Sequence, residues 1–160
     1  MRIAAASHIE PLVRAFEKTE GDVLEMGTGY YSTSLLSWLC ELSGRRLYSF
    51  EASRKWFEKT VKNKKPFHFV EHVHDWDGVD LNQRWGLAFI DHGPGERRHV
   101  DIKRLVNFAN CIVVHDSEPQ SDHVYQYSKI WDLFKYRIDY KKYRAWTTII
   151  SNSEDVRTWE

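Results

Sequence analysis

The sequence predicts an α/β protein built on a doubly wound, mostly parallel sheet of seven strands that ends in an antiparallel hairpin. Short apolar runs alternate with amphipathic helical segments through residue 116, which is typical of parallel strands joined by helical crossovers. Two further β-type runs, 134–140 and 146–151, are separated only by residues 141–145. This connection is too short for a crossover, so the two runs must pair antiparallel.

The elements follow from local patterns along the chain. Ile9, Leu12, Val13 and Phe16 recur at helical spacing and predict an opening helix. The first strand is predicted at 22–26, followed by a helix that Ser32 caps and Gly44 ends. The same reasoning predicts further strands at 46–51, 67–72, 87–91 and 112–116, and helices from Ser53 to about residue 62, at 96–108 and at 121–131.

Length, charge and cysteine content restrict the class of protein. The 160 residues suit one domain, which we assign to 1–160. The 23 basic and 23 acidic residues cancel, so composition favours neither a nucleic-acid nor a membrane partner. Two cysteines in apolar segments make no disulfide framework, and the N-terminus is too polar for a signal peptide. We therefore expect a cytoplasmic protein.

The stretch VLEMGTGYYS places Gly27 and Gly29 directly after the first strand. Ligands bind at the carboxyl ends of parallel strands, where glycine allows close approach to the backbone and a helix N-terminus attracts an anion. A dinucleotide fingerprint has a third glycine, but Ser32 stands at that position. A small anion such as an amino-acid carboxylate is therefore favoured over a pyrophosphate.

Glu51 ends the second predicted strand, 24 residues after Gly27. An acid at about this distance accepts hydrogen bonds from ribose hydroxyls in nucleotide-binding sheets. The alternative is a solvated acid that precedes a helix. Together with the glycine turn, Glu51 favours a nucleoside-like ligand.

The chain resembles the class I S-adenosylmethionine-dependent methyltransferases in VLEMGTGYYS, LYSFEAS, HDWDG, LAFIDHGPGE and CIVVHDSE, from about residue 9 to residue 151. It is most similar to small enzymes of the catechol O-methyltransferase type, whose fourth strand also ends in Asp-His. The resemblance implies a Rossmann-like fold and S-adenosylmethionine as cofactor. It also implies a set of cofactor contacts: Glu25, Gly27 and Gly29 beside the methionine part, Ser32 at its carboxylate, Glu51 at the ribose, Asp75 and Trp76 at the adenine, and Asp91. The alternative for Asp75 and Trp76 is an ordinary loop with a half-buried ring.

Two predicted strands end in mirrored pairs, Asp91-His92 and His115-Asp116. Neighbouring strands would bring these side chains together, where they could hold a divalent cation or supply a general base. We predict His92 as the first candidate base, with His115 and Asp116 as further catalytic candidates. The alternatives are that Asp91 touches only the cofactor and that His115 is a core histidine.

Catechol-type enzymes bind magnesium through acids at these two strand ends, which implies Asp91 and Asp116 as ligands and Mg²⁺ as an optional second cofactor. Pro94 and Ser117 stand where that family has a lysine base and an asparagine.

Two other patterns favour structural interpretations. His68, His72 and His74 alternate along the third strand and are expected to face solvent rather than to bind zinc. The run YRIDYKKYRAW mixes basic and aromatic residues, as single-strand nucleic-acid binders do. Protection of an edge strand is the interpretation we favour for this run.

The expected function is S-adenosylmethionine-dependent methyl transfer to a small-molecule acceptor at oxygen, without a nucleic-acid or membrane partner. A homo-oligomer could complete the acceptor pocket. One alternative is a module that binds S-adenosylmethionine or S-adenosylhomocysteine without transferase activity, as a partner or regulatory subunit. The other is a nicotinamide-dependent oxidoreductase, which Ser32 and the terminal hairpin disfavour.

Overall fold

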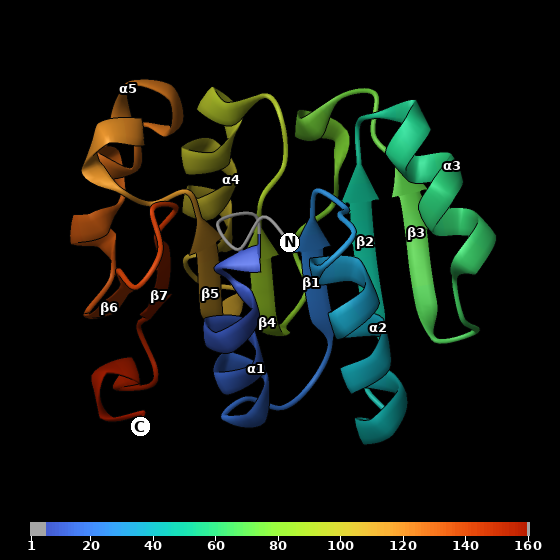
Figure 1. Cartoon of the computed structure of the whole chain (residues 1–160), viewed down its shortest axis with the longest axis horizontal. Coiled ribbons are helices and arrows are strands. Elements are labelled where there is room, and N and C mark those ends of the chain that lie inside the picture. The colour runs from blue at the N-terminus through green and yellow to red at the C-terminus, as the bar shows by residue number, and fades with distance from the viewer. Residues whose placement is uncertain (1–5, 160) are drawn as a thin grey trace.

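All seven strands form, and they lie in one sheet. The computed structural model describes residues 6–159. In chain order the strands are β1 (Val23–Met26), β2 (Leu47–Glu51), β3 (His68–His72), β4 (Trp85–Ile90), β5 (Ala109–His115), β6 (Tyr136–Tyr140) and β7 (Thr147–Ser151). Their order in the sheet is β3-β2-β1-β4-β5-β7-β6, with β7 antiparallel to both β5 and β6. The predicted fold class, a mostly parallel Rossmann-like sheet with a terminal hairpin, is confirmed (Figure 1).

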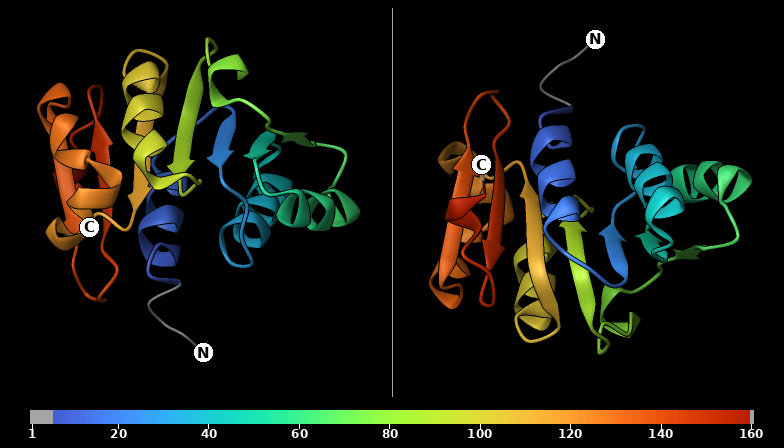
Figure 2. Two further views of the ribbon diagram at one scale, coloured as in Figure 1. Left: turned by 90° about the horizontal axis from the view of Figure 1, so that it is seen from above. Right: turned by 90° about the horizontal axis from the view of Figure 1, so that it is seen from below.

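Helices cover both faces of the sheet, which explains why the central strands β1 and β4 are buried throughout. Figure 2 shows α1 (Ile9–Glu17), α2 (Ser32–Ser43) and α3 (Arg54–Asn63) on one face, with α4 (Arg98–Leu105) and α5 (Asp122–Tyr125) on the other. Two hydrophobic clusters result. One contains Leu12 and Leu36 under the first two helices, and the other contains Ile102 and Leu105 of α4.

Three local predictions were wrong. The predicted helix 121–131 breaks after α5, because Gln126 has a φ of 55°, and continues as short 3₁₀ turns at 127–129 and 131–133. Ser32 does not cap α2; the cap position is Tyr31. His68 does not face solvent, because it is only 2% exposed.

The sheet changes direction between β1 and β4. The chain runs from β1 outward through β2 and β3, then returns to place β4 on the opposite side of β1. The loops after β1 and β4 therefore diverge at this point, which is where parallel α/β sheets bind ligands.

Gly27 sets the distance between these two loops. Its φ is +88°, and a Cβ atom there would lie 2.6 Å from the Cα of His92 and 2.7 Å from the carbonyl carbon of Asp91. Only glycine allows this approach without backbone movement.

The turn between β6 and β7 lies at the same edge of the sheet. Thr147 is the register partner of His115, so residues 141–146 project beyond the end of β5 (Figure 1). The basic residues Lys141, Lys142 and Arg144 are exposed there.

Two observations bear on the expected location of the protein. Cys40 and Cys111 are both free and buried. Within residues 6–159, no helix is long and apolar enough to cross a membrane. Residues 1–5, the start of the segment considered as a signal peptide, lie outside the described residues.

Replacing Gly27 with Ala should destabilise the protein by about 2 kcal/mol or more, because it adds a left-handed non-glycine residue and a backbone overlap. The measurement is the free energy of unfolding from urea titration. Gly78→Ala is the matched control, since a Cβ there meets nothing within 4 Å. Equal stability of the two variants would contradict the importance of the approach at Gly27.

Candidate functional site

A crevice of about 490 Å³ opens at the carboxyl ends of β1, β2 and β4. Gly27 and Thr28 form its base after β1, and Glu51 closes the side after β2. The remaining lining residues come from the following loops and α3: Ala52, Ser53, Trp56, Asp91, His92, Gly93 and Pro94. The structure thus brings three predicted cofactor residues, Gly27, Glu51 and Asp91, to one cavity.

The carboxylate of Glu51 is held in place by the loops around it. Thr28 donates its backbone N–H and its hydroxyl to Oε2 (2.7 and 2.9 Å), and Ser53 donates its backbone N–H to Oε1 (2.6 Å). A carboxylate accepts about four hydrogen bonds. Glu51 therefore keeps about one position, on Oε1, for a ligand hydroxyl.

Glu25 does not line the crevice; it is fully buried beneath the glycine loop. Thr33 donates to its Oε1 (2.9 Å) and accepts from the N–H of Gly29 (2.9 Å), while Ser49 donates to its Oε2 (2.6 Å). Burial raises the pKa of Glu25 to about 7, against the opposing effect of the hydroxyls of Ser49, Ser32 and Thr33. Glu25 thus acts on the site by fixing the loop through Thr33.

Ser32 and Gly29 have positions that differ from the predicted contacts. Ser32 is 2% exposed and lies below the loop, with its hydroxyl 3.4 Å from where a Cβ on Gly29 would stand. Ser32 therefore faces the protein interior and the carboxylate of Glu25. Gly29 lines a different groove, between α2 and α3.

The predicted adenine contacts are not in the crevice. Trp76 is 6% exposed, packs on His92 with ring centroids 4.3 Å apart, and donates its indole N–H to the carbonyl of Gly93 (3.0 Å). Asp75 is exposed and accepts from the N–H of Asp77 in its own turn. The aromatic ring that does line the crevice is Trp56.

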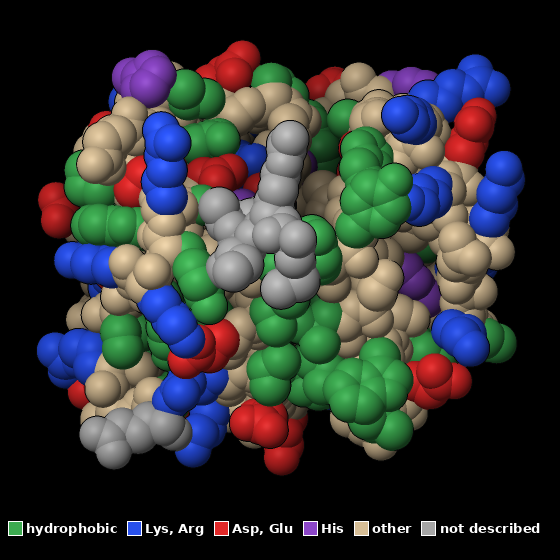
Figure 3. Space-filling model, viewed as in Figure 1, with side chains coloured by type: hydrophobic (Ala, Val, Ile, Leu, Met, Phe, Trp, Pro, Cys, Tyr) green, Lys and Arg blue, Asp and Glu red, His purple; other side chains and the backbone are tan. Residues whose placement is uncertain are grey.

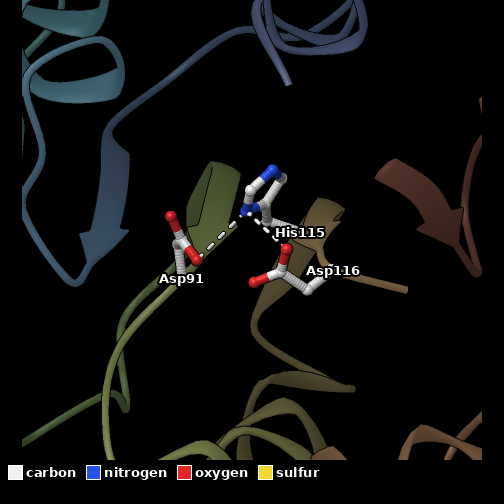
Figure 4. A group of neighbouring side chains, drawn as sticks. All are labelled: Asp91, His115 and Asp116. Carbon is white, nitrogen blue, oxygen red and sulfur yellow. Dashed lines mark hydrogen bonds and ion pairs between the residues drawn. The ribbon is translucent and has the colours of Figure 1, made fainter. Parts of the chain in front are cut away.

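Asp91, His115 and Asp116 form a cluster beside the crevice (Figure 4). Nδ1 of His115 lies 3.3 Å from Asp91 and 3.5 Å from Asp116. Arg98, at the start of α4, completes the cluster. Its guanidinium lies 2.9 Å from Asp91 and 3.4 Å from Asp116 and donates to the carbonyl of His92 (2.7 Å).

The charges in this cluster balance one another. Burial alone would lower the pKa of His115, but hydrogen bonds and charges from Asp116 and Asp91 raise it to about 9. Burial would raise the pKa of Asp116, but His115 and Arg98 lower it to about 2. At neutral pH two carboxylates thus face one imidazolium and one guanidinium.

This arrangement does not fit the predicted metal site. The ligand atoms of Asp91, His115 and Asp116 lie within 4.8 Å of one another, close enough for one ion. However, Nδ1 of His115 carries a proton at neutral pH, and Arg98 already pairs with both acids. Metal ligands must be deprotonated, so Mg²⁺ would have to displace both cations.

His92 is unsuited to the role of catalytic base. It is 1% exposed, and its Nε2 pairs with the buried carboxylate of Asp101 (3.1 Å) on α4. Burial also lowers its pKa, although Asp101 opposes this effect. His92 contributes its backbone to the crevice while its ring anchors α4.

The N-terminal segment closes the cluster from the other side. The hydroxyl of Ser7 lies 3.0 Å from Nε2 of His115. The ring of His8 packs edge-on against His115 (centroids 4.8 Å apart), and neither of its nitrogens has a hydrogen-bond partner among the described residues. Burial and the charge of His115 lower the pKa of His8 to about 4, so its ring is neutral.

Sequence reasoning missed the residues that complete the site from outside the strand ends: Ser7, His8, Trp56, Arg98 and Tyr125. Tyr125 donates its hydroxyl to Asp116 (3.1 Å). The signal available for Arg98 was its position in GPGERRH, a few residues after the fourth strand. Nothing in the local pattern marks Ser7 or His8.

The fold matches solved methyltransferase structures, while no protein-family model and no curated protein matches the sequence. Sp1610 of Streptococcus pneumoniae, a candidate tRNA (m1A22) methyltransferase solved with S-adenosyl-L-methionine, is 10% identical with a TM-score of 0.62, over 89% of this chain and 72% of its own. The human methyltransferase 10 domain containing protein is 12% identical with a TM-score of 0.62, and the match covers 91% of this chain and 82% of that protein. TrmK of M. capricolum, solved with S-adenosyl-homocysteine, is 14% identical with a TM-score of 0.56, and the match covers 90% of this chain and 68% of that protein. At these identities the likeness establishes the methyltransferase fold.

These neighbours bear on three expectations. The catechol O-methyltransferase subtype finds no support among them, and neither does Mg²⁺. A small-molecule acceptor without nucleic acid is contradicted, because the neighbours include tRNA and RNA methyltransferases. The expectation of no nucleic-acid partner relied on the net charge of the whole chain, which averages over surfaces of opposite sign.

Glu25→Gln should remove a pH-dependent loss of stability. The pKa of Glu25 rises from 4.5 to about 7 on folding. The unfolded chain therefore loses this proton first, and the unfolding free energy falls as pH rises from 4.5 to 7. Between these limits the stability of the variant relative to wild type should increase by about 3 kcal/mol.

Urea unfolding between pH 4.5 and 8 measures this difference. Glu17→Gln, at an exposed position of α1, is the control and should follow wild type. Parallel curves for wild type and Glu25→Gln would show that the buried carboxyl does not ionise in this range.

Proposed function

We propose that the protein is an S-adenosylmethionine-dependent methyltransferase whose acceptor is a nucleic acid. The observation that carries the proposal is the crevice at the β1–β4 divergence, where the Gly27 backbone, Glu51 and Asp91 meet in a chain with the methyltransferase fold. Cofactor complexes among the structural neighbours support the choice of cofactor. The RNA and tRNA methyltransferases among them support the acceptor class.

The crevice fits the nucleoside part of the cofactor. The free acceptor position on Oε1 of Glu51 takes one ribose hydroxyl. Trp56 and Pro94 line the same cavity and offer flat apolar surface to the adenine ring. The amino-acid tail would lie against Gly27 and Thr28, which line the same cavity.

The acceptor would approach over Asp91 and Asp116, whose side chains are 28% and 25% exposed. Ionised carboxylates accept hydrogen bonds, so they favour an acceptor that presents an N–H group, such as a nucleobase. The exposed cations Lys141, Lys142 and Arg144 at the β6–β7 turn lie at the same edge of the sheet and suit the phosphate backbone.

The chain would contribute alignment of the acceptor. S-adenosylmethionine, when bound, would supply a methyl group activated by its positively charged sulfonium, and the residues of the site would orient the acceptor for in-line attack on it. Asp91 and Asp116 accept hydrogen bonds from the acceptor N–H and orient its nitrogen for attack, and water takes the proton that the nitrogen loses. Arg98 and protonated His115 lower the pKa of Asp116 and so keep this carboxylate ionised, and Arg98 also pairs with Asp91 at 2.9 Å.

Calorimetric titration should show that S-adenosylmethionine and S-adenosylhomocysteine bind and that NAD does not. Glu51→Ala should weaken S-adenosylmethionine binding by about tenfold or more, because it removes the ribose acceptor and frees Thr28 and Ser53 from their anchor. Glu71→Ala, an exposed acid on the adjacent strand β3, should bind as wild type. Absence of binding to wild type would refute the proposed cofactor.

Asp116→Asn should lower the rate of methyl transfer to RNA at least tenfold while S-adenosylmethionine affinity stays within twofold, because the amide lacks the charge that orients the acceptor N–H. Asparagine tolerates the positive φ of 54° at this position, so the fold should persist. The assay follows transfer of a labelled methyl group to total tRNA, with the exposed Asp132→Asn as control. Cofactor binding without transfer to any RNA would instead favour a binding module without transferase activity.

A further inference from the structure

A second groove, of about 230 Å³, lies between α2 and α3 on the face of the molecule seen in Figure 1. Its walls carry three aromatic rings, Tyr30, Trp38 and Trp56. Tyr30 and Trp38 are 65% and 58% exposed, which is unusual for rings of this size. Small polar residues such as Ser34 and Ser37 also line it. The site described above uses none of these residues except Trp56.

Cations surround this groove. Residues 54–65 contain six basic side chains and one acidic side chain, although the whole chain has no net charge. Lys59 lines the groove and places its ammonium group over the ring of Tyr30, 3.1 Å from the centroid. Figure 3 shows Lys and Arg side chains over α3, beside hydrophobic side chains over α2. Glu41 is the acid among the lining residues, and Lys65 pairs with it at 3.8 Å.

The groove adjoins the cofactor crevice. Trp56 lines both cavities, and its ring packs edge-on against Tyr30 with centroids 4.7 Å apart. A chain bound in the groove would therefore pass close to the crevice rather than lie on a remote surface.

We propose that the α2–α3 groove binds a single-stranded segment of a nucleic acid, with one base stacked on Trp38 or Tyr30 and the phosphates beside Lys59 and the neighbouring lysines. Exposed aromatic rings in a cationic groove are the combination that holds single strands, because every base has a face that stacks. The inference extends the proposed function by adding a contact for the strand that flanks the acceptor. The inference rests on the proposed function only for the choice of a nucleic acid as the molecule bound in the groove.

The test measures binding of a fluorescein-labelled single-stranded RNA of about ten nucleotides, of mixed sequence, to the full chain at several NaCl concentrations. Trp38→Ala should weaken binding about 5- to 100-fold without changing the salt dependence, because stacking releases no counterions. Lys59→Gln should lower the slope of log Kd against log salt by about 0.7, the value for one lost phosphate contact on a single strand.

Matched controls remove an aromatic ring or a basic charge at positions away from the groove. Phe69→Ala removes an exposed ring on β3, and Lys18→Gln removes an exposed cation after α1. Both should bind as wild type. All four variants should retain the wild-type unfolding midpoint and S-adenosylmethionine affinity.

Three outcomes would overturn the inference: no RNA binding by wild type, unchanged RNA binding by both groove variants, or loss of a homodimer by Trp38→Ala with RNA binding intact. The last outcome would identify the groove as an interface between copies of the chain. RNA binding that depends on Trp38 and Lys59 without any affinity for S-adenosylmethionine would support the groove and refute the proposed methyltransferase function.

Discussion

The close approach of Gly27 to the backbone at Asp91 and His92 is the constraint on which the candidate site depends. It fixes the loop after β1 against the loop after β4 at the point where the sheet changes direction. This contact leaves the carbonyl of His92 facing α4, where Arg98 donates to it. The same guanidinium then reaches Asp91 and Asp116. The absence of a side chain at Gly27 thus allows the series of contacts that joins the cofactor crevice to the charged cluster beside it.

The charged cluster shows how a half-buried acid can stay ionised through neighbouring cations. Asp116 would be driven toward the neutral form by burial, but the positive charges of His115 and Arg98 keep it ionised. His115 is protonated for the same reason, since two acids lie next to it. Such mutual compensation is expected of buried charges, which are paired when they occur. The cluster therefore resembles a fixed set of hydrogen-bonding groups more than a metal centre.

The distribution of charge along the chain matters more than its total. The whole sequence is neutral, yet residues 54–65 carry six basic side chains to one acidic, and residues 135–144 carry five to one. The sheet places these segments on opposite flanks, around β3 and around β6. A nucleic acid is attracted by a local surface within about a Debye length rather than by net charge. A neutral composition is therefore a poor guide to whether a chain binds a nucleic acid.

The sequence by itself determined the sheet, the strand-end positions of Gly27, Glu51, Asp91 and Asp116, and the antiparallel hairpin. These features follow from local periodicity, glycine placement and connection length, which act within a few residues. Only the tertiary structure decided which side chains point into the crevice. Glu25, Ser32 and Trp76 turned out to be buried, while Trp56 lines the cavity.

Long-range contacts account for the rest of the site. Ser7 and His8 lie more than a hundred residues from His115 along the chain, and Arg98 joins the ends of two strands from a helix. Burial and charge pairing then set the protonation of His115, Asp116 and Glu25. No local pattern in the sequence encodes these contacts, because they depend on how helices and strands pack in three dimensions.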